Sequence, residues 1–178
     1  AEKSVVAMRQ IEPQLVQEMV KVGCVLVDNQ QDIQRLVDLT VLPNGTPNKQ
    51  FVGKNASVIL DAAHIPYNGD PRLIILRTPK DHPFAVIEML MPILPVVTVD
   101  SFEEGLDVCL MLEAGLHHTA TMHSLNMERL NRMARKMKTS IFVKNGPSYA
   151  GLGFSGEGTT TSMSSGVVSE IQAAMPDS

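Results

Sequence analysis

The sequence predicts an α/β fold with three layers, in which helices cover both faces of a mostly parallel sheet. Short apolar segments alternate with amphipathic ones along most of the chain, and this alternation is typical of parallel sheets. Residues 72–77 (RLIILR) and 95–99 (PVVTV) are apolar throughout their middle, as burial on both faces of a sheet requires. A length of 178 residues fits one domain.

The first half of the chain begins with a short apolar strand at residues 4–8. Pro13 then opens a helix, at a position where its missing N–H costs nothing, and Gly23 ends that helix. Further along, the pattern predicts a strand at 24–27, a helix at 30–39, an exposed loop at 43–49 (PNGTPNK) and a short helix at 55–63.

The second half alternates more regularly. Ser101 and Glu104 form a capping box, in which the serine side chain accepts from a free helix N–H and the glutamate reaches back. This pair predicts a helix that ends near Glu113. The other predicted elements are strands at 72–77, 96–99, 118–123 and 141–144 and a helix at 125–137, preceded by Ser124.

Composition and charge exclude several classes of function. The formal net charge is −4 and no basic stripe dominates, so nucleic acid is not an expected partner. No apolar run approaches the roughly 20 residues that span a membrane, and no signal peptide is visible. The two cysteines are too few for a disulfide framework or a zinc site. A reducing, cytoplasmic setting fits this composition best.

A glycine-rich loop follows the last predicted strand. Gly151, Gly153 and Gly156 have the spacing of a dinucleotide-binding fingerprint. Such a fingerprint leads directly into a helix whose N-terminus holds the pyrophosphate. Here Gly156 is followed by EGTTTS, which is poor helix material, and the loop comes late in the chain. We therefore reject a phosphate cradle, and two alternatives remain: a tight turn, or a loop packed close to a catalytic centre.

Five segments of the chain carry a further signal: AEKSVV at 1–6, HPF at 82–84, EMLMPILP at 88–95, HTATMHS at 118–124 and IFVKNGPSYAGLGFSGEG at 141–158. Together they resemble the CoA-acylating aldehyde dehydrogenases, which are the acetaldehyde and propionaldehyde dehydrogenases of bacterial microcompartments. The resemblance covers residues 1–161, and residues 162–178 form a divergent tail.

The resemblance implies a covalent mechanism. In this family a cysteine thiolate attacks the aldehyde, hydride passes to NAD⁺, and CoA takes the acyl group from the resulting thioester. The nucleophile is expected immediately before Ala1, and the NAD-binding half before that, so the chain by itself is predicted to be inactive. Neither Cys24 nor Cys109 is expected to replace it, because each lies in an apolar segment.

The resemblance also implies cofactor-binding residues. Glu88 and Pro92 match a Glu-x-x-x-Pro motif whose glutamate holds the hydroxyls of the nicotinamide ribose, because a carboxylate can accept from both. The alternative is a solvated glutamate that caps a local turn. Met91 stands where many members of the superfamily have glycine, which leaves the shape of the loop open.

Catalytic and channel residues follow from the same resemblance. His118 matches a histidine that can relay protons as the CoA thiol attacks, and the alternative is a hydrogen-bonded core histidine. Asn145 could donate to the developing oxyanion, or it could close a strand end. Ser148 and Tyr149 resemble residues that line the aldehyde channel. Strand alternation would separate His118 from the neighbouring histidines, so no metal site is expected.

Other properties of the chain stay open at this stage. The basic face of the 125–138 helix could attract CoA phosphates, although a solvated surface is the simpler interpretation. The tail has a short amphipathic pattern similar to peptides that target cargo to microcompartment shells, so the lumen of a microcompartment is a possible location and its shell a possible partner. A homo-oligomer is expected. The alternative function is a non-catalytic module: a truncated paralogue, or a binding or assembly partner of a microcompartment.

Overall fold

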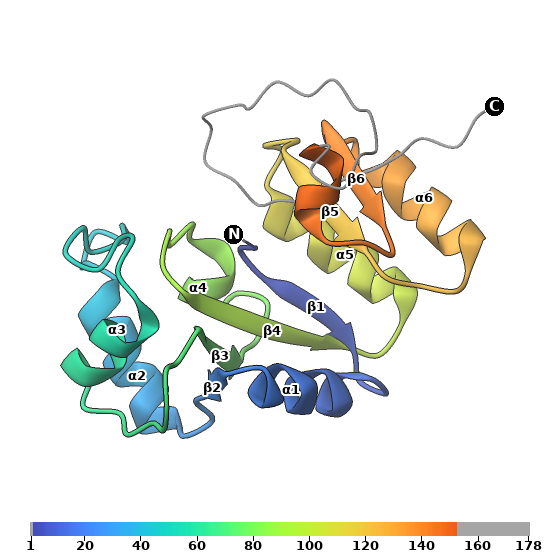
Figure 1. The fold of residues 1–178 in the computed structure, drawn as a ribbon. Helices are drawn as coiled ribbons and strands as arrows, with labels where there is room; N and C mark the ends of the chain where they lie inside the picture. The colour runs from blue at the N-terminus through green and yellow to red at the C-terminus, as the bar shows by residue number, and fades with distance from the viewer. Residues whose placement is uncertain (1, 153–178) are drawn as a thin grey trace. The chain divides into compact units, whose positions relative to one another are not determined.

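The computed structural model describes residues 2–152 and divides into two compact units (Figure 1). One unit comprises Lys3–Ser101, and we call it the 3–101 unit. The other comprises Glu2 together with residues from Phe102 onward, and we call it the 102–152 unit. Each unit is described by itself.

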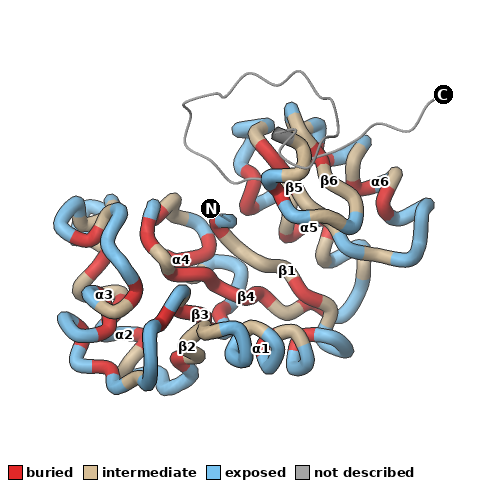
Figure 2. The backbone as a smooth tube through the Cα atoms, in the orientation of Figure 1, coloured by how far each residue is buried: buried red, intermediate tan, exposed pale blue. Residues whose placement is uncertain are grey.

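The 3–101 unit is built on a four-stranded parallel sheet in the order β1-β4-β3-β2. The two inner strands are the most deeply buried, and six of the seven residues of β4 are buried (Figure 2). Their apolar sequences, which predicted burial on both faces, are therefore confirmed as strands inside a sheet. The strands are β1 (Val5–Met8), β2 (Cys24–Leu26), β3 (Leu73–Arg77) and β4 (Ile93–Val99).

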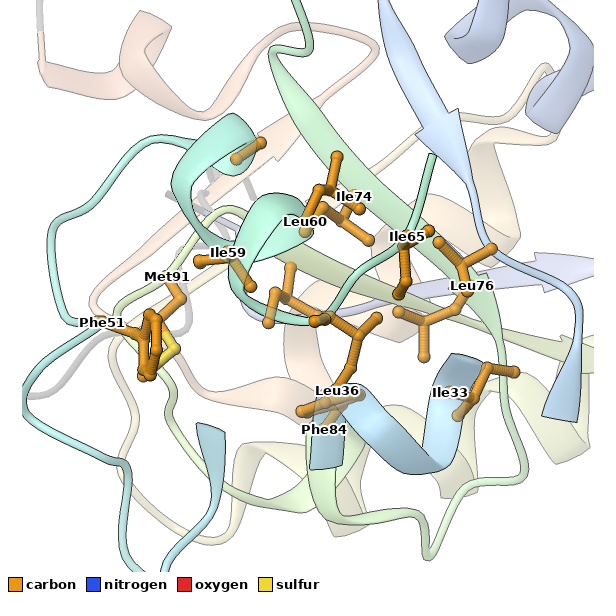
Figure 3. Packing of buried hydrophobic residues seen from close by; sticks show 14 of the residues in the cluster. Ile33, Leu36, Phe51, Ile59, Leu60, Ile65, Ile74, Leu76, Phe84 and Met91 are labelled. Carbon is orange, nitrogen blue, oxygen red and sulfur yellow. The ribbon is translucent and has the colours of Figure 1, made fainter. Parts of the chain in front are cut away.

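Helices cover both faces of this sheet. Since successive side chains of a strand point to opposite faces, one strand contacts helices on each side. Ile74 and Leu76 of β3 pack against α2, α3 and α4 (Figure 3), whereas Ile75 packs against Val16 of α1. The predicted three-layer α/β architecture is confirmed in this unit. The helices are α1 (Glu12–Lys21), α2 (Gln30–Thr40), α3 (Ala56–Ala62) and α4 (Pro83–Val86).

The 102–152 unit contains a second, smaller parallel pair, β5 (Thr119–Met122) and β6 (Ile141–Lys144). Two helices pack on it, α5 (Phe102–Glu113) and α6 (Met127–Met137), and a short 3₁₀ helix, η1 (Ser148–Leu152), follows β6. The buried centre of this unit consists of Leu106, Ala120, Met133, Met137 and Phe142.

Two predicted elements differ from the structure at their ends. The strand predicted at 118–123 is confined to Thr119–Met122, because His117 has a left-handed backbone (φ 52°) that breaks the alternation before the strand starts. The strand alternation on which the predicted separation of the histidines rests therefore does not extend to His117. The helix predicted from 125 begins at Met127, because Asn126 is its N-cap.

The N-cap of α6 gives a direct test of this boundary. The Asn126 side chain accepts a hydrogen bond from the Arg129 backbone N–H at 3.0 Å. Asn126→Ala leaves that N–H without its partner and should lower the free energy of unfolding by about 1 kcal/mol, whereas Asn126→Asp should preserve it. Urea unfolding followed by circular dichroism measures both variants. Equal losses in the two variants would contradict the capping role.

Candidate functional site

Glu88 lies in the segment between α4 and β4, and its carboxyl group is half-buried. Burial raises the pKa of this carboxyl group, while the positive charge of Lys3 and a hydrogen bond from the Leu90 backbone act in the opposite direction. One backbone donor does not use all the acceptor sites of a carboxylate. Glu88 therefore fits a ligand that offers hydroxyl donors.

The segment that carries Glu88 is fixed by its neighbours. Met89 and Met91 are buried in the core on the α2–α4 side of the sheet. Between them, Leu90 takes a left-handed backbone (φ 53°), and its carbonyl accepts from the Gly53 N–H at 3.0 Å. Met91, where many superfamily members have glycine, therefore anchors the segment.

Glu88 and Pro92 lie at the amino ends of the parallel strands. The Pro92 carbonyl accepts from the Ile74 N–H at 2.9 Å, next to the start of β3, and β4 starts at Ile93. Ligands of open parallel sheets usually bind at the carboxyl ends. At that end of this sheet, Arg77 pairs with Glu12 at 2.7 Å and Arg9 pairs with Asp100. The charged residues at the carboxyl end are thus paired with one another. Glu88 and Pro92, the candidate ligand residues of this unit, lie at the amino end, which the general rule does not favour.

His118 lies just before β5, in the 102–152 unit. It is half-buried, its Nδ1 is 3.0 Å from the Thr119 hydroxyl oxygen, and its carbonyl accepts from the Ile141 N–H at 3.4 Å. The contact with Thr119 fixes the imidazole ring relative to the strand. Both interpretations of the sequence, a proton relay and a hydrogen-bonded core histidine, are compatible with this environment.

Asn145 closes the carboxyl end of the β5–β6 pair. Its side-chain oxygen accepts from the Ser124 N–H at 2.8 Å, its side-chain nitrogen donates to the Ser124 carbonyl at 2.9 Å, and its backbone N–H donates to Met122 at 2.9 Å. Its φ of 55° is left-handed, a conformation that asparagine tolerates well. These contacts support a strand-closing role. A carboxamide nitrogen carries a second hydrogen, so the oxyanion role stays a prediction.

The β5–β6 pair places His118 and Asn145 at opposite ends. The four steps from His118 to Met122 span about 13 Å of strand at ~3.3 Å per residue, and Asn145 is bonded to Met122. The two side chains therefore do not converge on one small group such as a carbonyl oxygen. The resemblance had named both as catalytic, and the structure separates them.

Ser148 begins η1 and is buried, whereas Tyr149 is 54% exposed. The Ser148 hydroxyl donates to the Glu2 carboxylate at 2.7 Å. Sequence reasoning gave no role to Glu2, and no local pattern could have, because the two residues are 146 positions apart.

The two cysteines have the properties of structural thiols. Cys109 packs against the core of the 102–152 unit, and desolvation raises the pKa of its thiol to about 12. Burial also raises the pKa of the Cys24 thiol, although the charge of Arg72 opposes this shift. Since the thiolate is the nucleophilic form, neither environment activates its cysteine.

The basic face of α6 is partly engaged within its own unit. Arg132 forms two hydrogen bonds to Glu103, and the guanidinium groups of Arg129 and Arg132 each lie 5.6 Å from the centre of the Phe102 ring. These contacts favour a surface role over phosphate binding. No group of three or more potential metal ligands occurs among residues 2–152. The glycines at 153 and 156 lie outside the described residues.

Comparison with known proteins finds relatives that are named as acylating enzymes. No protein-family model matches it. A propanal dehydrogenase (CoA-propanoylating) of Citrobacter freundii is 49% identical over 162 residues, which is 90% of this chain and 35% of that protein. An acetaldehyde dehydrogenase (acetylating) of Salmonella typhimurium is 50% identical over 117 residues, which is 66% of this chain and 25% of that protein.

Solved structures agree with these relatives. A propionaldehyde dehydrogenase of Rhodopseudomonas palustris, with bound CoA and an acylated cysteine, superposes with a TM-score of 0.86 at 37% identity, over 95% of this chain and 40% of that one. A propionaldehyde dehydrogenase from the fucose utilisation microcompartment of Clostridium phytofermentans superposes with a TM-score of 0.84 at 37% identity, over 94% and 40%. The chain spans about a third of the length of the curated relatives it matches. By sequence and by fold, the chain is similar to a part of the CoA-acylating aldehyde dehydrogenases.

Proposed function

We propose that the chain is a portion of an NAD-dependent enzyme that converts a short-chain aldehyde and CoA to acyl-CoA through a cysteine thioester. We use the name extended protein for the longer protein that includes the residues before Ala1. Identity of 49% to a propanal dehydrogenase (CoA-propanoylating) supports the reaction and the substrate class. The acylated cysteine in the Rhodopseudomonas palustris relative supports the covalent step.

The spacing between a cysteine and a histidine in the sequence of one relative is the main support for the proposal. In the Clostridium phytofermentans enzyme, a cysteine and a histidine have each been replaced by alanine, at positions 269 and 387, which are 118 residues apart. If the nucleophile immediately precedes Ala1, His118 follows it by the same 118 positions. This agreement supports both the placement of the nucleophile and the choice of His118 rather than His117 as the functional histidine.

The chain's own residues supply binding and proton handling. NAD⁺, when bound, accepts the hydride. Glu88 fits this cofactor, since its half-buried carboxylate keeps acceptor sites that can take the hydroxyls of the nicotinamide ribose. Pro92 fixes the end of the Glu88 segment at the start of β4.

His118 and Asn145 lie at opposite ends of the β5–β6 pair, so only one of them can serve the carbonyl group that CoA attacks, and we propose His118 for that role. His118 accepts the thiol proton as CoA attacks the thioester. Asn145 holds the loop after β6 through its two hydrogen bonds to Ser124. Of the two channel residues, exposed Tyr149 is the one that contacts the aldehyde, since the Ser148 hydroxyl is bonded to Glu2.

Replacing Glu88 tests the cofactor assignment. In the extended protein, Glu88→Ala should raise the KM for NAD⁺ about 10- to 100-fold, the equivalent of hydrogen bonds to a charged group worth about 1.5–3 kcal/mol. Steady-state kinetics at saturating aldehyde and CoA measures it. Glu18→Ala, which removes an exposed carboxylate paired with Lys21, is the matched control.

The pH dependence of NAD⁺ binding sharpens the same test. Burial raises the pKa of the Glu88 carboxyl group, so that group loses its charge at a higher pH than an exposed glutamate does. The KM for NAD⁺ should therefore rise as the pH falls through this raised pKa, and Glu88→Gln should lose that dependence. An unchanged KM for NAD⁺ in Glu88→Ala would contradict the assignment.

One relative supports a proposal about the location of the extended protein. A similar structure comes from a fucose utilisation microcompartment, and we propose that the extended protein is a homo-oligomer in the cytoplasm or the lumen of such a compartment. Among residues 2–152, no helix is long and apolar enough to cross a membrane. Removal of residues 164–178 should reduce co-purification with shells if the tail is a targeting peptide, and unchanged co-purification would end that idea.

A further inference from the structure

Two hydrogen bonds connect the loop that contains Gly53 to the Glu88 carboxylate through the backbone of Leu90. The Gly53 N–H donates to the Leu90 carbonyl at 3.0 Å. The Leu90 backbone N–H, the only donor that a leucine backbone has, is bonded to the Glu88 carboxyl group two residues earlier. The backbone of Leu90 therefore limits the orientations that this carboxyl group can take.

Leu90 has an unusual backbone conformation for its residue type. Its φ of 53° is left-handed, which is disfavoured for a bulky L-residue because Cβ comes too close to the following carbonyl oxygen. The Leu90 side chain is 55% exposed, so burial of that side chain does not explain the conformation. Residues held in such conformations cluster at binding and catalytic sites, where the surrounding structure fixes them.

The neighbours of Leu90 hold this conformation in place. Met89 and Met91, on either side of it, are 4% and 8% exposed and belong to the hydrophobic cluster on the α2–α4 side of the sheet. Phe51, two residues before Gly53, belongs to the same cluster (Figure 3). The loop and the Glu88 segment thus share a packed core as well as the hydrogen bond from Gly53 to Leu90.

We infer that Leu90 is a positioning residue, whose left-handed backbone, held by Gly53, directs its N–H at the Glu88 carboxylate and so fixes the acceptor that the hydroxyls of the cofactor meet. This inference rests on the proposed function, because it takes Glu88 as the ligand of the nicotinamide ribose. Leu90 acts through its backbone, and a residue with a different side chain but the same backbone conformation can replace it.

A series of Leu90 variants in the extended protein tests this role. Asparagine is about as large as leucine and tolerates a left-handed backbone, whereas the β-branched side chain of valine does not. Leu90→Val should raise the KM for NAD⁺ about 3- to 10-fold, the equivalent of one hydrogen bond, with kcat retained. Leu90→Asn and Leu90→Gly should retain a KM for NAD⁺ close to that of the wild type.

The pH profile is a readout that a merely structural role would not move. A hydrogen bond to the ionised form lowers the pKa of a carboxyl group, so loss of the Leu90 donor should raise the pKa of Glu88 further. The increase in the KM for NAD⁺ on acidification should begin at a higher pH in Leu90→Val than in the wild type or Leu90→Asn. Lys3, the charged side chain that acts on this carboxyl group, is unchanged in every variant.

Gly53→Ala disturbs the same connection from its other end. Gly53 has a φ of 69°, and a Cβ added there meets nothing within 4 Å, so the substitution acts through backbone strain alone. It should raise the KM for NAD⁺ in the same direction as Leu90→Val, and it decides the question if Leu90→Val does not fold. Gly69→Ala is the matched control, because Gly69 has a φ of 70° and equally open surroundings, and it should leave this KM unchanged.

A second control separates strain from positioning. His64 is exposed, lies in the same unit and has a left-handed backbone with a φ of 54°. His64→Val should lower the urea midpoint of unfolding about as much as Leu90→Val does, but it should leave the KM for NAD⁺ and its pH profile as in the wild type.

The outcomes are distinct. If the wild-type extended protein forms no acyl-CoA, or if Glu88→Ala leaves the KM for NAD⁺ unchanged, the cofactor assignment and this inference fail together. If Glu88→Ala raises that KM while Leu90→Val and Gly53→Ala do not, the positioning role is overturned and the proposed function stands. A higher KM in Leu90→Asn than in Leu90→Val also overturns it, because the apolar side chain rather than the backbone would then serve the cofactor.

Discussion

Residues 1–178, produced by themselves, are expected to form no acyl-CoA from propanal, NAD⁺ and CoA. Loss of a catalytic nucleophile costs on the order of 10⁶ in rate in a serine protease, and the nucleophile of this family is expected before Ala1. Neither cysteine of the chain can take its place. The Cys109 thiol has a pKa of about 12, and burial raises the pKa of Cys24 too. The measurement is NADH absorbance together with acyl-CoA detection by mass spectrometry.

Two comparisons make this result informative. The extended protein should form acyl-CoA, and the same protein with its nucleophilic cysteine replaced by alanine should be as inactive as residues 1–178. Circular dichroism of residues 1–178 establishes whether the isolated chain is folded. Acyl-CoA formed by the isolated chain would overturn the proposed mechanism, and Cys24→Ser and Cys109→Ser would then show which thiol carries the reaction.

The two inner strands of the 3–101 unit could be predicted from the sequence because their burial is two-sided. The segment 72–77 has only apolar residues between its two arginines, and the structure places Leu73–Arg77 inside the sheet. Residue type decides the outcome here, since only an inner strand can accommodate apolar side chains on both faces. The predicted strand at 96–99 began three residues late, since β4 runs from Ile93 through Pro95 to Val99.

The division into two units could not be predicted, since alternation of strands and helices looks the same whether the strands share one sheet or form two. β5 and β6 pair only with each other among the described strands. Their pairing depends on contacts distant in sequence, such as the bond from Asn145 to Met122. The predicted strand began at 118, one residue before β5. His117 has a left-handed backbone just before this strand, and its residue type does not indicate that conformation.

The candidate site could be predicted only where the family resemblance supplied residues. Glu88 and His118 came from motifs, and the structure adds their environments: a half-buried carboxyl group and an imidazole bonded to Thr119. Glu2 lies in the AEKSVV segment that carries the resemblance, but neither pattern nor motif gave it a partner. Its contact with Ser148 is created only by the folded chain.

Replacing His118 should separate the two halves of the reaction. In the extended protein, His118→Ala should lower steady-state acyl-CoA formation about 10²- to 10⁴-fold, the usual contribution of general acid–base catalysis. The first half-reaction does not need His118 in our scheme. A burst of NADH equal to one enzyme equivalent should therefore remain, and the acyl-enzyme should accumulate and be visible by mass spectrometry.

His117→Ala is the matched control for this prediction, because His117 is the adjacent histidine and is exposed. Its ring Nδ1 lies 3.4 Å from the Met137 carbonyl oxygen, which is a long hydrogen-bond contact. His117→Ala should keep nearly the full rate. If His118 is instead a hydrogen-bonded core histidine, His118→Ala should lower the free energy of unfolding and reduce both half-reactions together, without accumulation of acyl-enzyme. Since the Thr119 hydroxyl loses the same contact in either case, the accumulation of acyl-enzyme, rather than the loss of stability, decides between the two roles.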